Sequence, residues 1–280
     1  MGFYTGKKVF LSGGSKGIGR EAALQLAGAG ADVTIAARGQ ADLDATLEAL
    51  QAARPGAHRA VSVDIRDPAA VQAAMDDAAA DHGGLDVLIC NAGYARTGDV
   101  ATSPLDAYSE LLQVNYLGHV HLVKAAVPHL VARKGHISLV SSMLGFMSVY
   151  GYSAYSASKF ATAGFAEALR QEMLLEGVTV SVFYPPTTET PGLEEENRDK
   201  PPLVWAIESE NSFTRTYTAE AVARELLRSI ERGGFENVVG WDSWLVFWAR
   251  RAFPAIFRFF SDQELRAAAR KVASQGEKNR

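Results

Sequence analysis

The segment YSASK at residues 155–159 places a phenol and an amine four positions apart. On a helix, residues at positions i and i+4 lie on one face, so Tyr155 and Lys159 would be neighbours. A phenol with a pKa of about 10 is a poor base at neutral pH. An ammonium group about 4 Å away, at an effective dielectric constant of about 20, favours the phenolate by about 4 kcal/mol. That preference would lower the pKa by about three units, which makes the pair a candidate acid–base site. The alternative is an ordinary helical turn that exposes both groups.

A second hydroxyl could complete a site for carbonyl chemistry. Ser142 follows an apolar segment at 136–140 and precedes Tyr155 by thirteen residues. Hydride reduction of a ketone needs a proton donor for the oxygen, and a serine hydroxyl can hold that oxygen by a hydrogen bond. Ligands of open α/β sheets bind outside the carboxyl ends of the strands. If 136–140 is a strand, Ser142 and the helix of Tyr155 can converge there.

A glycine-rich turn could hold the hydride carrier. Glycines at 13, 17 and 19 separate an apolar segment from an alanine-rich one. Glycine permits a tight turn and a close approach of backbone to a pyrophosphate, and the following helix N-terminus favours phosphate. The residues predicted to line this turn are Gly13, Ser15, Lys16, Gly17, Ile18 and Gly19. The alternative is a glycine-rich turn without a ligand.

The residues at the end of the next apolar segment indicate which dinucleotide binds. NAD sites carry a carboxylate about 20 residues after the glycines, on the ribose 2′-hydroxyl. Here the sequence reads Ala36-Ala37-Arg38. Arg38 can pair with a 2′-phosphate and Lys16 can reach the same group, so we predict NADP(H). Two solvated surface cations are the alternative.

Two further turns fit a cofactor. Asp64, followed by Ile65, is placed to accept a hydrogen bond from the adenine amino group. Asn91, Ala92 and Gly93 form a small-residue turn against which a cofactor can lie. Asp and Asn-Ala-Gly are also common turn formers, which is the alternative for both.

The elements that must position these residues alternate along the chain. Between residues 7 and about 185, short apolar or β-branched segments alternate with longer alanine-rich ones. The predicted strands are 9–11, 32–37, 60–63, 87–90, 136–140 and 179–183. The predicted helices are 19–30, 41–53, 68–82, 104–131, 154–176 and 218–231. This alternation predicts an α/β fold with a doubly wound parallel sheet and helices on both faces.

The motifs together resemble those of the short-chain dehydrogenase/reductase family. They are Gly13-x3-Gly17-x-Gly19, Asn91-Ala92-Gly93, Ser142 and Tyr155-x3-Lys159, within residues 5–235. The resemblance implies a Rossmann-type fold, catalysis by the serine, tyrosine and lysine, and contact of Tyr155 and Lys159 with the cofactor. Members are often dimers or tetramers, so it also implies a homo-oligomer.

The resemblance implies three more site residues. Asn115 aligns with an asparagine that would hold a water linking Lys159 to solvent; the alternative is a buried amide that bonds backbone. The Pro-Gly-x3-Thr of the family appears as Pro185-Pro186-x3-Thr190. Pro185 and Thr190 would contact the nicotinamide, although proline in place of glycine weakens the backbone contacts expected there.

Two longer strings suggest a substrate. YPPTTETPGLEEENRDKP and YSASKFATAGFAEALRQE are similar to the 3-ketodihydrosphingosine reductases, which use NADPH to reduce a C3 ketone in sphingolipid synthesis. The resemblance implies a long-chain keto-amine as substrate. Acidic residues of the first string could contact the amine of that substrate; the alternative is a solvated charged loop. In the eukaryotic members a lysine stands where this chain has Asp42, which weakens the prediction of NADP(H) without reversing it. The alternatives are another ketone, such as a 3-oxoacyl thioester or a steroid, and a non-catalytic NADP(H)-binding protein.

The composition changes after residue 183. Residues 184–202 are rich in proline and charge, and 241–260 are rich in Trp, Phe and Arg. We predict one NADP-binding domain at 1–240, with a substrate loop at about 186–217, and an aromatic and basic segment at 241–280. Aromatic residues with arginines suit peripheral contact of 241–260 with a bilayer surface. An oligomer interface or a lid over the substrate is the alternative.

Bulk properties limit the other functions. The 280 residues carry a net charge of −4, which gives no reason to expect nucleic acid as a partner. Cys90 is the only cysteine, so no intrachain disulfide forms, and the six histidines lack the spacing of metal ligands. No signal peptide or spanning segment is recognised. We therefore expect a cytoplasmic protein, peripheral at the cytoplasmic membrane face, with no metal.

Overall fold

A computed structural model describes residues 2–210 and 215–278, and its centre is a parallel sheet of seven strands. Their order is β3-β2-β1-β4-β5-β6-β9, with every neighbouring pair parallel. The strands are β1 (Lys8–Ser12), β2 (Asp32–Ala37), β3 (Arg59–Ser62), β4 (Val87–Cys90), β5 (His136–Val140), β6 (Thr179–Tyr184) and β9 (Glu236–Val238). The order reverses between β1 and β4, which is where doubly wound sheets bind their ligands.

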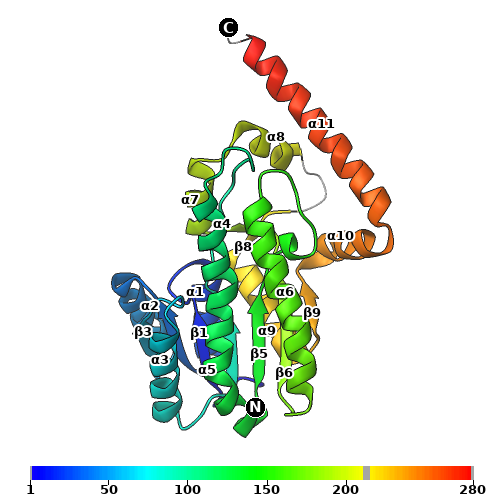
Figure 1. The fold of residues 1–280 in the computed structure, drawn as a ribbon. Coiled ribbons are helices and arrows are strands. Elements are labelled where there is room, and N and C mark those ends of the chain that lie inside the picture. The colour runs from blue at the N-terminus through cyan, green and yellow to red at the C-terminus, as the bar shows by residue number, and fades with distance from the viewer. Residues whose placement is uncertain (1, 211–214, 279–280) are drawn as a thin grey trace.

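Helices cover both faces of this sheet (Figure 1). One apolar core joins the sheet to α3 (Pro68–His82), α5 (Gly118–Arg133) and α6 (Ser153–Leu174). A second joins the other face to α1 (Gly17–Gly28), α2 (Gln40–Ala53) and α9 (Ala219–Arg232). Strands β4 and β5 are buried along their whole length, because helices pack on both sides of them. The predicted fold class is confirmed.

The predicted helix 104–131 is three elements. An α-helix, α4 (Leu105–Leu112), passes through a π-helical turn, η1 (Gln113–Leu117), into α5. Asn115 lies in that turn and is fully buried. Single π turns inside α-helices occur mostly at functional sites, so the widened backbone marks the place where this side chain is needed.

The proline-rich segment after β6 is more ordered than the sequence indicates. It contains β7 (Thr188–Glu189), α7 (Pro191–Arg198), α8 (Pro202–Glu210) and β8 (Tyr217–Thr218). The Thr190 side chain accepts a hydrogen bond from the Leu193 N–H, and Pro191 opens the helix, as is common at a first turn. Residues 211–214 of the predicted substrate loop lie outside the described residues, as do 1 and 279–280.

Two helices follow the last strand, α10 (Gly240–Ala252) and α11 (Pro254–Lys278). The first packs against the body through Val246 and Phe247, while α11 extends away from it past α8 (Figure 1). Among the described residues, no helix is both long enough and apolar enough to span a bilayer.

Candidate active site

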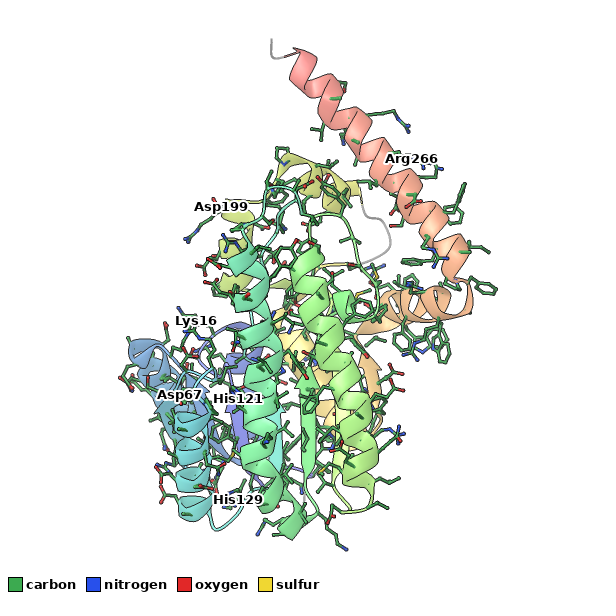
Figure 2. All side chains as sticks on the ribbon, in the orientation of Figure 1. Lys16, Asp67, His121, His129, Asp199 and Arg266 are labelled. Atoms are coloured by element: carbon green, nitrogen blue, oxygen red, sulfur yellow. The ribbon has the colours of Figure 1, made fainter. Side chains whose placement is uncertain are left out.

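The predicted site residues come together at the carboxyl end of the sheet. The glycine turn follows β1, the Asn91 turn follows β4, Ser142 follows β5, and Thr190 follows β6. Figure 2 shows Lys16 toward this end, while His129 lies at the opposite end of α5. His129 pairs with Asp76 at 2.9 Å, and no three acidic, histidine or cysteine side chains of the described residues gather as metal ligands.

The glycine turn has the shape of a phosphate cradle. Gly13 and Gly17 have φ angles of 69° and 53°, which glycine adopts readily. A Cβ on Gly19 would overlap the Gly13 carbonyl oxygen, and one on Gly17 would lie 3.0 Å from Thr190. No side chain caps the first turn of α1, so its N–H groups remain free for an anion. These features fit a dinucleotide pyrophosphate.

Hydrogen bonds fasten the first two turns to each other. The Ser12 hydroxyl accepts from the Asn91 and Ala92 N–H groups at 3.1 and 3.2 Å. The Asn91 amide in turn donates to the carbonyl oxygens of Ser12 and Gly13 at 3.2 Å each. Asn91 and Ala92 are thereby held against the glycine turn, as their predicted place beside the cofactor requires.

The two catalytic candidates on α6 face the end of β5. Lys159 is 4% exposed, and its amine donates to the Val140 carbonyl oxygen at 3.1 Å. The same amine lies 5.8 Å from the centre of the Tyr155 ring. Ser142 hydrogen-bonds to Tyr155, and its hydroxyl oxygen accepts from the Leu144 N–H at 3.1 Å. The structure therefore brings the serine, tyrosine and lysine together.

Asn115 joins the turn after β4 to α6. Its Oδ1 accepts from the Tyr94 N–H at 3.0 Å, and its amide donates to the Tyr94 carbonyl at 3.0 Å and to the Ser158 hydroxyl at 2.9 Å. A Cβ on Gly93 would lie 2.8 Å from Oδ1 and 3.4 Å from the Lys159 amine. Both amide hydrogens are used, which leaves one lone pair of Oδ1 for a relay water.

Of the residues expected to contact the adenosine end of the cofactor, some already pair with charged side chains of the protein. Arg38 is exposed and forms no ion pair with any described residue. Lys16 pairs with Asp42 at 2.8 Å, so its charge is already matched. Asp64 is held by the Arg66 guanidinium, with Nη2 at 2.5 Å, and this hydrogen bonding lowers the pKa of Asp64.

Four other predicted cofactor residues have backbone or packing roles. Ile65 is buried, and a Cβ on Gly118 would overlap its side chain. The Ser15 carbonyl accepts from the Thr46 hydroxyl at 3.2 Å, and Ile18 packs on the core under α1. On the far side of the site, the Pro185 carbonyl accepts from the Met143 N–H at 3.1 Å, which fixes the strand end beside Ser142.

A sequence model of the short chain dehydrogenase family matches residues 7–201. The chain belongs to the short-chain dehydrogenase family. The resemblance seen in the motifs is thereby confirmed, and with it an oxidoreductase that uses a nicotinamide dinucleotide.

Several relatives of similar sequence are named 3-dehydrosphinganine reductase or 3-ketodihydrosphingosine reductase. The chain is 36% identical to 3-dehydrosphinganine reductase TSC10B of Arabidopsis thaliana, over 82% of this chain and 68% of that protein. It is 34% identical to 3-ketodihydrosphingosine reductase of Mus musculus, over 86% and 73%. In fold it is similar to a short chain dehydrogenase/reductase of Burkholderia phymatum solved in complex with NAD, with a TM-score of 0.79, 24% identity, and coverage of 90% and 95%.

The acid–base balance of this short-chain dehydrogenase differs from the expected one. Burial raises the pKa of Tyr155 to about 12, although the hydrogen bond with Ser142 acts in the opposite direction. Burial also lowers the pKa of Lys159 to about 8. In the chain by itself the pKa of the phenol is therefore raised and not lowered as predicted, because burial has the largest effect on it.

Sequence reasoning missed several residues around the site. His119 is fully buried, its Nε2 lies 2.8 Å from the Ala92 carbonyl oxygen, and burial with the charge of Lys159 lowers its pKa to about 3. A neutral His119 therefore donates to the cofactor turn. Its position four residues after Asn115, on one helical face, is the only sequence signal for it. A charged cluster around Tyr152 was also missed, because its partners come from α7 and α8.

Proposed function

We propose that this short-chain dehydrogenase reduces the C3 ketone of 3-ketodihydrosphingosine to dihydrosphingosine with NADPH, as a step of sphingolipid synthesis. The observation that carries the proposal is the similarity along more than four-fifths of the chain to 3-dehydrosphinganine and 3-ketodihydrosphingosine reductases. The grouping of Ser142, Tyr155 and Lys159 at one end of the sheet supplies the chemistry that such a reaction needs.

Tyr155 is the proton donor in this proposal. When bound, NADPH supplies the hydride. A phenol whose pKa is about 12 keeps its proton at neutral pH, which is the state that reduction requires. The Lys159 ammonium beside the ring stabilises the phenolate left after transfer.

Ser142 orients the substrate. Its oxygen accepts from the Leu144 N–H, and its hydroxyl hydrogen, directed at Tyr155 in the chain by itself, would turn to the ketone oxygen when substrate binds. Asn115 holds the turn after β4 against the catalytic helix and offers its remaining lone pair to a relay water. The residues proposed to line the cofactor are Gly13, Ser15, Lys16, Gly17, Ile18, Gly19, Arg38, Asp64, Ile65, Asn91, Ala92, Gly93, Tyr155, Lys159, Pro185 and Thr190.

The direct test is turnover of purified protein with NADPH and 3-ketosphinganine, followed by the near-ultraviolet absorbance of NADPH. Oxidation of NADPH with formation of dihydrosphingosine supports the proposal. Faster turnover of a 3-oxoacyl thioester or a steroid ketone would assign the same chemistry to another substrate. Binding of NADPH without reduction of any of these ketones would favour a non-catalytic protein.

The choice of NADPH over NADH rests on Arg38, which is exposed and forms no ion pair with any described residue. Replacing Arg38 with alanine removes a charged hydrogen bond to the 2′-phosphate, so the Kd for NADPH is expected to rise by about 10- to 100-fold. The Kd for NADH should change by less than about twofold, because NADH lacks that phosphate. Quenching of protein fluorescence measures both constants.

Asp42 provides the matched control for this prediction. It holds Lys16 at 2.8 Å, so Asp42→Asn frees a cation beside the same phosphate and is expected to tighten NADPH binding. If Arg38→Ala raises the Kd for NADPH and the Kd for NADH by the same factor, Arg38 does not contact the 2′-phosphate.

We also propose that residues 1–240 form the catalytic unit, with the substrate loop at about 186–217, and that the C-terminal segment 241–280 rests on a membrane surface. Three tryptophans on one face of α10 are exposed, Trp241 by 65%, Trp244 by 53% and Trp248 by 49%. Exposed Arg258 lies near them in sequence, at the start of α11. Exposed tryptophans followed by an exposed arginine on the next helix match the composition of segments that bind the interface of an anionic bilayer.

This surface predicts binding to vesicles of phosphatidylcholine and phosphatidylserine. Replacing all three tryptophans with alanine is expected to weaken cosedimentation by about tenfold or more, because three large apolar side chains no longer enter the bilayer. Leu174→Ala with Leu175→Ala is the control, since these exposed leucines lie at the end of α6, away from α10. Unchanged vesicle binding with a loss of oligomers in the tryptophan variant would show that a second copy covers the face.

A further inference from the structure

A charged cluster lies beside the catalytic helix, where α7 and α8 cross the carboxyl end of the sheet (Figure 1). The Tyr152 hydroxyl is 2.5 Å from Oε1 of Glu196 and 2.5 Å from Oε1 of Glu208. The Lys200 amine is 3.2 Å from Glu196 Oε1 and 2.7 Å from Glu208 Oε2, and its side chain is 1% exposed. The same amine lies 5.1 Å from the Trp205 ring centre.

The cluster holds more negative than positive charge. Two carboxylates face one ammonium, so a net negative charge lies in a largely buried place, which is costly unless a cation completes it. The Glu196 side chain is only 10% exposed. Its Oε1 is shared between Tyr152 and Lys200, whereas its Oε2 accepts no hydrogen bond from any described residue. The Glu196 carboxylate therefore keeps one oxygen that can accept a further hydrogen bond.

This free oxygen belongs to a residue within electrostatic reach of the reacting atoms. The Tyr152 and Tyr155 ring centres are 6.2 Å apart. Because the Tyr152 hydroxyl is 2.5 Å from Glu196 Oε1, the carboxylate lies one aromatic side chain away from Tyr155, and its charge contributes to the raised pKa of Tyr155. In a 2-amino-3-ketone the ammonium is on the carbon next to the carbonyl. A ketone oxygen at Tyr155 therefore brings that ammonium close to Glu196.

We propose that Glu196 selects ketones that carry a neighbouring ammonium group, by pairing its free carboxylate oxygen with that ammonium. The assignment rests on the proposed function for the reaction itself. Lys200 keeps its ion pair with Glu208, the nearer of its two partners, while the substrate ammonium pairs with Glu196, so the two positive charges balance the two carboxylates. Glu196 is thus a specificity-determining residue, while Tyr152 and Lys200 hold α7 and α8 in place around it.

The test compares two ketones that differ only in the amine. One is 3-ketosphinganine and the other is 1-hydroxyoctadecan-3-one, in which hydrogen replaces the amino group. Wild-type protein is expected to prefer the amine by at least about tenfold in kcat/KM, and Glu196→Gln to lower that preference by about 10- to 100-fold, as for loss of a charged hydrogen bond. Removal of the carboxylate should also move the alkaline limb of the Tyr155 titration to lower pH.

Tyr152→Phe is the matched control, because it removes a hydroxyl from the same cluster but no charge. It is expected to slow both ketones alike and leave the preference intact. If Glu196→Gln lowers kcat/KM equally for both ketones, Glu196 only holds α7 in place and the assignment is overturned. If that variant does not fold, a wild-type protein with no preference between the two ketones overturns it equally. Wild-type protein that reduces neither ketone overturns the proposed function, and the selection by Glu196 with it.

Discussion

Replacing Tyr155 with phenylalanine is expected to lower kcat for ketone reduction by about 10²- to 10⁴-fold, the range that a positioned general acid contributes. The reason is geometric as well as chemical. The phenol hydrogen-bonds to Ser142, lies beside the Lys159 amine, and keeps its proton at neutral pH because its pKa is about 12. The variant keeps the ring and loses only the hydroxyl. Steady-state rates with NADPH and 3-ketosphinganine measure the effect.

Tyr152 again offers a close control, because it is a tyrosine on the same face, three residues earlier and at the boundary of the same helix. Its hydroxyl is bound by two carboxylates and is not free to serve a ketone. Tyr152→Phe should therefore lose much less activity than Tyr155→Phe. If the two variants lose similar amounts, or if Tyr155→Phe retains more than about a tenth of the wild-type kcat, the proton comes from another group.

The local parts of this fold could be predicted from the sequence because they depend on neighbours in the chain. The strand at 87–90 is apolar throughout and the strand at 136–140 is mostly apolar, as expected of doubly buried parallel strands, and both have the predicted bounds. The glycines at 13, 17 and 19 could be recognised because each position excludes a side chain for a reason of local backbone geometry. The spacing of Tyr155 and Lys159 needed only the helical period.

What could not be predicted depends on contacts between distant segments. The π turn at Asn115 has no sequence mark of its own, since its hydrogen bonds run to Tyr94 and Ser158. Strand β9 has only three residues and becomes a strand by pairing with β6. The cluster of Tyr152, Glu196 and Lys200 joins α6 to helices in a segment whose prolines suggested only turns.

The electrostatic error has the same origin. A spacing of four residues predicts that an amine lies near a phenol, but it does not reveal how much solvent either group loses. In the structure the amine of Lys159 is buried and donates a hydrogen bond to the Val140 carbonyl oxygen. Burial favours the neutral form of each group, so it raises the pKa of Tyr155 and lowers the pKa of Lys159. At neutral pH the phenol of Tyr155 therefore keeps its proton.

This account of Lys159 predicts that its replacement by methionine lowers activity and raises stability. Loss of the ammonium removes the charge that stabilises the phenolate, so kcat should fall by about 10²-fold or more. Burial holds the pKa of Lys159 in the folded chain at about 8, below the 10.5 of a free lysine, so below pH 8 the buried charge costs about 3 kcal/mol. The variant also loses the hydrogen bond to the Val140 carbonyl oxygen, which costs it about 1 kcal/mol. Lys159→Met should therefore be more stable than the wild type by about 2 kcal/mol at pH 7.

The pH dependence distinguishes this penalty from a packing effect. Between pH 8 and 10.5 the unfolded chain holds a proton that the folded chain has released, so the free energy of unfolding of the wild type rises with pH in that window. Lys159→Met lacks this rise, and its advantage in urea denaturation should therefore disappear by about pH 10. Lys124→Met, which removes an exposed lysine from α5, should show no such change. Two results would contradict this account: a Lys159→Met protein that is less stable than the wild type at pH 7, or a gain in stability that is the same at pH 7 and pH 10. Either would show that Lys159 is not a buried ammonium group, and the role assigned to it beside Tyr155 would fail.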